Sequence, residues 1–199
     1  MSVKTITVYA ASSSKIDPFY MKMAWQLGAL LASYGIACVN GGGNKGLMAA
    51  VTNGILQSSG RVTGIIPQFM IDEGWLHPHL SEVIATSDMH TRKQLMAQKS
   101  DACIALPGGI GTLEELLEII TWKQLGLYTK PVVILNAKGY YNDLLRMLGK
   151  AVSEKFMSEP HAGMWAVADT PEEAMSQVMT QPEWHQPPAL SWLINSEHG

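Results

Sequence analysis

The chain has 199 residues, of which 47% are hydrophobic and 16% are charged, and its formal net charge is −3. This length suits one domain with a full core, and the negative charge gives no footprint for DNA or RNA, so we expect no nucleic-acid partner. No run of eighteen apolar residues occurs and residues 1–4 lack a signal-peptide pattern, which predicts a cytoplasmic protein without a membrane span. The low charge, with twelve Met and six Trp, fits either a large core or an apolar surface covered by another subunit.

Strand-like and helix-like segments alternate along the chain. Strands are predicted at residues 5–10, 36–39, 62–66, 83–86, 102–106, 131–135 and 165–168. Helices are predicted at 18–34, 47–58, 89–99, 113–125, 142–152 and 171–179. The stretch 67–81 is predicted as the longest irregular loop.

Several predicted strands are continuous apolar runs, such as 103–106 and 132–135. Strands of this kind are buried on both faces, as in a parallel sheet with helices on either side. The sequence therefore predicts an α/β fold: one doubly wound, Rossmann-like domain over residues 1–180, with a mainly parallel sheet of about seven strands. Residues 181–199 are predicted as a tail, and Trp184 and Trp192 suggest that it docks, with a second subunit as one candidate surface.

A first glycine-rich loop, Gly41-x-Gly43-x-x-Gly46, follows the second predicted strand. It matches the dinucleotide fingerprint, but that interpretation needs an acidic residue at the end of the next strand, which here ends Pro67-Gln68. The same glycines also suit a loop that lets backbone N–H groups approach a phosphate or ribose, or a tight turn with no ligand. Binding of NAD is the least favoured of the three interpretations.

A second glycine-rich loop lies between a buried strand and a helix, where Gly108, Gly109 and Gly111 leave the backbone N–H groups unshielded. With the positive end of the helix dipole, this loop is a cradle for an anion and best suits a phosphate. Glu115 follows it and allows two interpretations. It completes a capping box with Thr112 as N-cap, or it is a catalytic carboxylate that stays ionised near the helix N-terminus.

Two adjacent basic residues, Arg92 and Lys93, fall on the face of the helix at 89–99 that Met89, Leu95 and Met96 make apolar. Long basic side chains can extend from such a face to solvent. Beside the same sheet edge as a phosphate-binding loop, however, the pair is better explained as ligand contacts.

The chain resembles the Lonely Guy family, the cytokinin riboside 5'-monophosphate phosphoribohydrolases, long labelled as possible lysine decarboxylases. The resemblance covers roughly residues 3 to 180. It rests on Met89-His90-Thr91-Arg92-Lys93, on Pro107-Gly108-Gly109-Ile110-Gly111-Thr112-Leu113-Glu114-Glu115, on 118–136, and on Gly41-Gly42-Gly43 with Gly46-Leu47-Met48.

The resemblance implies a Rossmann-like homodimer that needs no cofactor and no metal and cleaves an N6-substituted AMP, or AMP, into free base and ribose 5-phosphate. It also implies that Arg92 and Glu115 are the catalytic pair. The implied substrate contacts are Lys93, Gly108, Gly109, Ile110, Gly111, Thr112, Thr121, Gly42, Gly43, Ser13 and, with its spacing displaced by about one residue, Glu73.

Two segments depart from the family pattern. Ala10-Ala11-Ser12-Ser13 stands where the family has Cys-Gly-Ser-Ser. The amino-acid sequence of the segment 68–80 also differs from that of the family, which leaves the preferred base open. No segment offers both the Schiff-base lysine and the acidic partner that a pyridoxal phosphate decarboxylase needs. Two alternatives remain: a carrier of a phosphorylated pterin or nucleotide that does no chemistry, and a weakly supported metal site at His77-x-His79.

Overall fold

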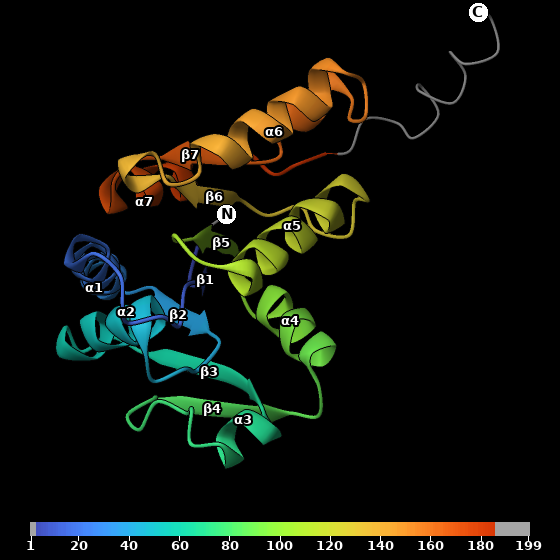
Figure 1. The fold of residues 1–199 in the computed structure, drawn as a ribbon. Helices are drawn as coiled ribbons and strands as arrows, with labels where there is room; N and C mark the ends of the chain where they lie inside the picture. The colour runs from blue at the N-terminus through green and yellow to red at the C-terminus, as the bar shows by residue number, and fades with distance from the viewer. Residues whose placement is uncertain (1–2, 186–199) are drawn as a thin grey trace, which may run out of the picture.

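The computed structural model describes residues 3–185, and its centre is a 7-stranded sheet in the order β4-β3-β2-β1-β5-β6-β7 (Figure 1). Every neighbouring pair of strands is parallel. The strands are β1 (Thr5–Tyr9), β2 (Ala37–Asn40), β3 (Val62–Pro67), β4 (Glu82–Thr86), β5 (Ala102–Ala105), β6 (Val132–Leu135) and β7 (Ala166–Ala168). The predicted parallel sheet of seven strands is confirmed.

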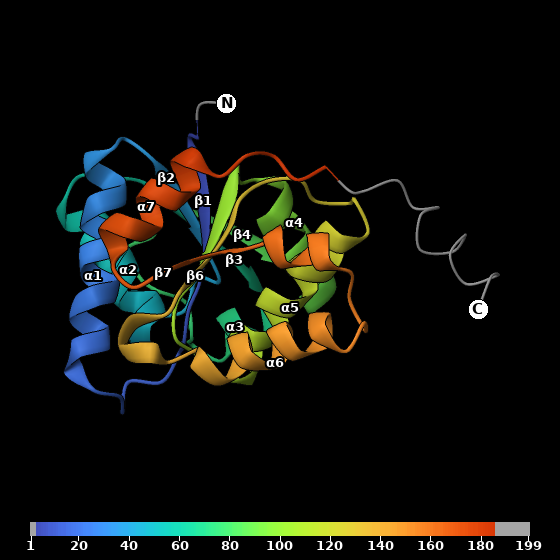
Figure 2. The ribbon, with the colours of Figure 1, turned by 90° about the horizontal axis from the view of Figure 1, so that it is seen from above.

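Helices cover both faces of the sheet, as Figure 2 shows from above. The α-helices are α1 (Pro18–Ser33), α2 (Gly46–Gln57), α3 (Gln68–Asp72), α4 (Met89–Gln98), α5 (Ile110–Gln124), α6 (Asn142–Ser153) and α7 (Pro171–Thr180). Helices α1, α2 and α7 pack on one face, while α4, α5 and α6 pack on the other. Strand β1 feeds both core layers because its side chains alternate: Ile6 and Val8 belong to one layer and Tyr9 to the other.

Two predicted segments differ from the structure in ways that matter for the site. The stretch 67–81 is not entirely irregular, because the five-residue helix α3 follows β3 directly; a helix this short has too few turns to show an apolar period. Helix α5 begins at Ile110, three residues before its predicted start, so that part of the glycine-rich loop is itself helical.

Helices α1 and α2 approach each other so closely that glycine is required at their contact. A Cβ on Gly54 would lie 2.1 Å from the backbone oxygen of Trp25, and a Cβ on Gly28 would lie 2.2 Å from that of Val51. Overpacking of a close contact costs about 1–3 kcal/mol. We expect Gly54→Ala to lower the melting temperature by roughly 5–10 °C.

The matched control for Gly54→Ala is Gly149→Ala in α6, where a Cβ would meet nothing within 4 Å. Alanine is the better helix former by about 1 kcal/mol, so this variant should be slightly more stable than the wild type. Thermal unfolding followed by circular dichroism measures both. Equal melting temperatures for the Gly54→Ala variant and the wild type would contradict the close-packing argument.

Lys123 of α5 is fully buried, and its Nζ donates a 2.9 Å hydrogen bond to the carbonyl of Lys130. Burial lowers the pKa of the amine from its ordinary 10.5 to about 8. The amine is therefore charged in both the folded and unfolded states below pH 8. Between pH 8 and 10.5 the unfolded chain still binds a proton that the folded chain releases, so stability from this group rises with pH.

We expect the unfolding free energy of the wild type, relative to Lys123→Met, to increase by about 2–3 kcal/mol between roughly pH 7 and pH 10. Denaturant unfolding of both proteins across this pH range measures the difference. Other groups that titrate there are common to both proteins and cancel. A difference that does not change with pH would show that the amine is not depressed in the fold.

The described part of the tail docks on the core. Trp184 packs against the α4–α5–α6 layer and its backbone N–H donates to the carbonyl of Thr129, at 2.8 Å. The side chain of Gln181 accepts a hydrogen bond from the N–H of Val132. Trp192, the other residue that suggested docking, lies outside the described residues.

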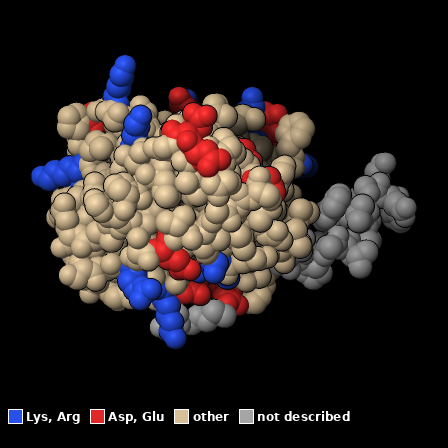
Figure 3. All heavy atoms as spheres, turned by 90° about the horizontal axis from the view of Figure 1, so that it is seen from below, with Lys and Arg blue, Asp and Glu red and all other residues tan. Residues whose placement is uncertain are grey.

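The surface of the β4 and α3 end of the sheet, seen in Figure 3, carries few Lys and Arg side chains, and these are scattered among Asp and Glu. That face shows no continuous basic stripe of the kind that a nucleic-acid site uses. None of the helices within residues 3–185 is long and apolar enough to cross a membrane.

Candidate active site

A cavity of about 640 Å³ lies along the carboxyl edge of the sheet. It includes the point where β1 and β5 are neighbours and the chain winds away in opposite directions, which is where open α/β sheets bind ligands. Its wall is formed by Ala10–Ser13 after β1, by Gly41, Gly43, Asn44, Lys45 and Met48 after β2, by Ile66, Met70 and Trp75 from the end of β3 onward, by Met89 and Arg92 of α4, and by Gly109, Ile110, Gly111, Thr112 and Glu115.

The start of α5 forms one end of this cavity. Its N-cap, Gly109, makes no side-chain cap, and a Cβ on Gly109 or Gly111 would meet nothing within 4 Å. Neither glycine has a positive φ, so neither the packing nor the backbone conformation requires glycine there. The absence of side chains leaves the first N–H groups of the helix open to the cavity. This is the geometry that an anion-binding loop requires, and the binding of a phosphate there stays a prediction.

Two tyrosine hydroxyls hold the same loop in place through hydrogen bonds to its carbonyl groups. The hydroxyl of Tyr141 donates to the carbonyl of Leu106 at 2.6 Å, and that of Tyr140 donates to the carbonyl of Gly108 at 2.8 Å. A Cβ on Gly108 would lie 2.1 Å from Oγ1 of Thr112, so Gly108 is needed for the close turn itself. These contacts fix the position of the loop before any ligand binds.

Arg92 and Glu115 meet on the wall of the cavity. Nη1 of Arg92 lies 2.9 Å from Oε1 of Glu115, and both side chains are less than a tenth exposed. Nε of Arg92 also donates to the carbonyl of Ile65 in β3, at 3.1 Å. The pair therefore connects α4, α5 and β3 at the wall of the cavity.

Glu115 is not part of a capping box, which corrects one of the two sequence interpretations. Because α5 begins at Ile110, Thr112 lies in its first turn rather than at the N-cap, and Glu115 lies in the second turn, facing Arg92. Burial raises the pKa of the Glu115 carboxyl, and the Arg92 guanidinium opposes this by favouring the charged form. This upward shift of the pKa is opposite to the downward shift expected for a carboxylate that the helix N-terminus keeps ionised.

The first glycine-rich loop makes room for Arg92. A Cβ on Gly41 would lie 2.0 Å from Nη2 of that arginine, so a larger residue here would displace the guanidinium. Gly42 has a φ of +72°, and its N–H donates to Oδ1 of Asn40. Gly42 therefore allows the tight turn, and Gly41 leaves space for the Arg92 side chain.

Lys93 is buried like Arg92 but is directed elsewhere. Its Nζ pairs with Glu114 and lies 3.0 Å from Oε1 of Glu118, both on α5. Burial by itself lowers the pKa of Lys93, but the hydrogen bonds to the two glutamates outweigh it, and the pKa is raised. Lys93 is not part of the cavity wall and instead ties α4 to α5.

The structure brings most of the predicted site residues together, and leaves some apart. Gly109, Ile110, Gly111, Thr112, Gly43 and Ser13 line the cavity with the Arg92–Glu115 pair. The residues that stand outside its wall are Lys93, Gly108, Gly42, Glu73 at the end of α3, and Thr121, whose hydroxyl donates to the carbonyl of Leu117.

Sequence reasoning missed several wall residues, among them Lys45, Met70 and Trp75. Met70 and Trp75 lie in the stretch taken as an irregular loop, and no periodic pattern marks them. Lys45 lies within the first glycine-rich loop. A basic residue beside exposed backbone N–H groups favours an anion, and this pattern could have identified Lys45 from the sequence.

His77 has a structural role in the described residues. Its Nε2 lies 3.2 Å from Oδ1 of Asn53, and its Nδ1 accepts from the backbone N–H of His79. No cluster of three His, Cys, Asp or Glu side chains suited to a metal occurs within residues 3–185. The structure therefore gives the His77-x-His79 hypothesis no third ligand.

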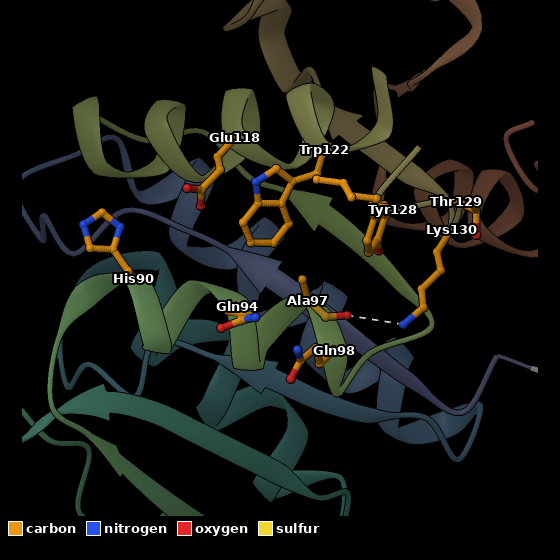
Figure 4. Close-up of a pocket in the computed structure, with 10 residues that line it drawn as sticks. His90, Gln94, Ala97, Gln98, Glu118, Trp122, Tyr128, Thr129 and Lys130 are labelled. Carbon is orange, nitrogen blue, oxygen red and sulfur yellow. Dashed lines mark hydrogen bonds between the residues drawn. The ribbon is translucent and has the colours of Figure 1, made fainter. Parts of the chain in front are cut away.

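A second cavity of about 580 Å³ lies between α4 and α5, away from the glycine-rich loops (Figure 4). His90, Gln94 and Gln98 face it from α4, with Glu118 and Trp122 opposite on α5. The Nζ of Lys130 closes one end through a 3.3 Å hydrogen bond to the carbonyl of Ala97. We name this hollow the α4–α5 groove.

The fold and the first cavity define a Rossmann-like protein with an open helix N-terminus at the sheet switch point and a buried Arg–Glu pair beside it. Residues 48–178 match the family described as "possible lysine decarboxylase". The chain is 41% identical to the cytokinin riboside 5'-monophosphate phosphoribohydrolase LOG7 of Arabidopsis thaliana, over 98% of this chain and 94% of that protein. It is 47% identical to LOG1 of the same plant, over 78% and 73% of the two chains.

The chain therefore belongs to the cytokinin riboside 5'-monophosphate phosphoribohydrolase family, and the predicted resemblance is confirmed. Among solved structures, the molybdenum cofactor binding protein of Rippkaea orientalis is 25% identical with a TM-score of 0.69, covering 90% of this chain and 98% of that one. The molybdenum cofactor carrier protein of Chlamydomonas reinhardtii is 22% identical, also with a TM-score of 0.69, and shows the fold alone.

Proposed function

We propose that this protein hydrolyses the N-glycosidic bond of a nucleoside 5'-monophosphate, N6-substituted AMP or AMP itself, and releases the free base and ribose 5-phosphate. The observation that carries the proposal is the buried Arg92–Glu115 pair beside the open N-terminus of α5, in one cavity. A relative at 41% identity over almost the whole chain bears the name of this activity.

The geometry suggests how the parts divide the work. The N–H groups at the start of α5 bind the phosphate, and this fixes the position of the ribose. Cleavage of an N-glycosidic bond passes through an oxocarbenium-like state, which a nearby carboxylate stabilises. Glu115 therefore binds the ribose hydroxyls or orients the attacking water and stabilises the developing cation. Arg92 keeps Glu115 in place and helps to hold the nucleotide and the departing base.

The alternative function is a carrier that binds a phosphorylated pterin or nucleotide without chemistry. Its support is the shared fold of the two molybdenum cofactor proteins, which are 22–25% identical to this chain. The enzyme relatives are much more similar, at 41–47%.

Incubation of the purified protein with AMP and N6-isopentenyl-AMP, followed by chromatography for free base and ribose 5-phosphate, tests the proposal. We expect both products in equal amounts from at least one nucleotide. A panel of other nucleoside monophosphates then identifies the preferred base. Tight nucleotide binding with no base released from any member of the panel would favour the carrier.

We further propose that the protein is a cytoplasmic homodimer, as the family resemblance implies. The α4–α5 groove supports a homodimer, because Trp122 and Leu127 line it and Leu127 is 72% exposed. Exposed apolar side chains of this kind are suited to burial by a second copy. Sedimentation equilibrium measures the assembly state, and a monomer at all concentrations would contradict the proposal.

A further inference from the structure

Trp75 has a large aromatic side chain that lines the candidate active-site cavity and does not pack in the hydrophobic core. Its side chain is 47% exposed and belongs to neither of the two core layers. A half-exposed indole at a cavity wall offers a flat apolar face on which a ligand ring can pack.

The backbone holds Trp75 in place against the first glycine-rich loop. Its carbonyl accepts a 2.9 Å hydrogen bond from the N–H of Asn44, and the Asn44 side chain donates to the carbonyl of Gly74. Two residues on, the N–H of His77 donates to the carbonyl of Gly42 at 2.8 Å. The backbone that carries the indole is therefore held against the first glycine-rich loop before a ligand arrives.

We place Trp75 and the start of α5 at the two ends of the cavity, because they follow strands that are three places apart in the sheet. The cradle follows β5 and Trp75 follows β3, and in the sheet β1 and β2 separate these two strands. Three strand spacings correspond to about 14 Å, the scale of a nucleoside monophosphate from phosphate to base. Arg92 lies between the two ends, because it contacts Glu115 of α5 on one side and Ile65 of β3 on the other.

Apolar side chains from β3, α3 and α4 line the same cavity as Trp75. They are Ile66 at the end of β3, Met70 of α3 and Met89 at the start of α4. A flat, weakly polar group fits such surroundings, whereas a phosphate or a ribose does not. Glu115 and Thr112 line the cavity from α5, while Asn44 and Lys45 of the first glycine-rich loop line it beside the segment that carries Trp75.

We propose that Trp75 stacks on the base of the bound nucleotide and gives the site its affinity for base-containing ligands. The inference rests on the proposed function in taking a nucleoside monophosphate as the occupant, but not on whether its glycosidic bond is cleaved. Stacking of a base on an aromatic side chain strengthens binding by roughly 5-fold to 150-fold. Trp75 is thus a specificity residue that does not touch the reacting bond.

The test compares a ligand that has a base with one that lacks it. AMP and ribose 5-phosphate are titrated calorimetrically into the Glu115→Gln protein, in which turnover is suppressed, and into the same protein with Trp75→Ala, Trp75→Phe or Phe69→Ala. Phe69 is the matched control, since it is 51% exposed on neighbouring α3 and does not line the cavity. Thermal unfolding verifies that each variant is folded.

We expect Trp75→Ala to raise the Kd for AMP roughly tenfold or more and to leave the Kd for ribose 5-phosphate unchanged. Trp75→Phe should retain most of the AMP affinity, and Phe69→Ala all of it. An unchanged Kd for AMP in Trp75→Ala, or an equal loss for both ligands, would overturn the proposal. If AMP binds as expected but the wild type releases no base, only the proposed function fails.

Discussion

Replacing Glu115 by glutamine is expected to lower kcat for base release by about 100-fold or more, the usual scale for a positioned base or charge stabiliser. Glutamine keeps the shape of the side chain and an oxygen that can accept from Arg92, but it carries no negative charge. The loss should therefore fall on kcat, because the charge acts on the oxocarbenium-like state rather than on the ground state. Steady-state kinetics on AMP and N6-isopentenyl-AMP measure it.

Glu114→Gln is the matched control, since Glu114 precedes Glu115 on α5 but pairs with Lys93 outside the cavity wall. Its kcat should equal that of the wild type. Near wild-type turnover by Glu115→Gln on every nucleotide tried would show that the mechanism is wrong.

The pH profile of the wild type gives an independent check on Glu115. The carboxyl must be ionised to act, and burial raises its pKa above the ordinary value of a glutamate. The acid limb of kcat/KM should therefore lie above about pH 4.3 and be absent from the residual activity of Glu115→Gln.

Replacing Arg92 by alanine is expected to affect activity and stability together. The guanidinium is the charged partner 2.9 Å from Glu115, and both side chains are buried. Without it, the pKa of Glu115 rises further and the acid limb of kcat/KM moves to higher pH, with a loss of about 100-fold at neutral pH. Breaking a buried ion pair by removing one partner also costs about 3 kcal/mol of stability.

The sign of the stability change with pH follows from the raised pKa. A carboxyl whose folded pKa lies above its unfolded value stabilises the fold below the unfolded pKa and loses that contribution as the pH rises through the folded pKa. Arg92→Ala should therefore be least stable, relative to the wild type, at neutral pH and recover part of the loss in acid. Denaturant unfolding at several pH values measures this.

The double variant Arg92→Ala with Glu115→Gln separates the two effects of Arg92. Removing the unpaired Glu115 charge should restore much of the stability lost in Arg92→Ala, while the activity stays low. If the double variant is as unstable as the sum of the two single variants, the buried pair is not the source of the loss.

Most of the fold was predictable from the sequence because its signals are local. Continuous apolar runs gave the parallel strands, and all of the helices longer than one or two turns have a predicted counterpart. The five residues of α3 lack a period and were missed. The start of α5 was misplaced because glycines at 108–111 suit either a loop or an open first turn, and only the backbone hydrogen bonds distinguish the two.

The candidate site was predictable in its residues but not in their partners. Arg92 and Lys93 are adjacent on one helical face, and both are buried as their position predicts. Adjacent residues point about 100° apart on a helix, however, so one reaches the cavity and the other reaches Glu114 and Glu118. No local pattern determines which of the two faces the ligand.

By itself the sequence determined the class of fold, the family, the two glycine-rich loops and the pair of residues expected to do the chemistry. The fold class and the loops follow from periodicity and local motifs, while the family and the catalytic pair follow from the resemblance of those motifs to a known family; all of these signals are encoded along the chain. The tertiary structure alone decided that Gly41 lies beneath the Arg92 guanidinium, and that Trp75 lines the same cavity as the start of α5. Both depend on contacts between segments far apart in sequence, and such contacts exist only once the sheet brings the ends of its strands together.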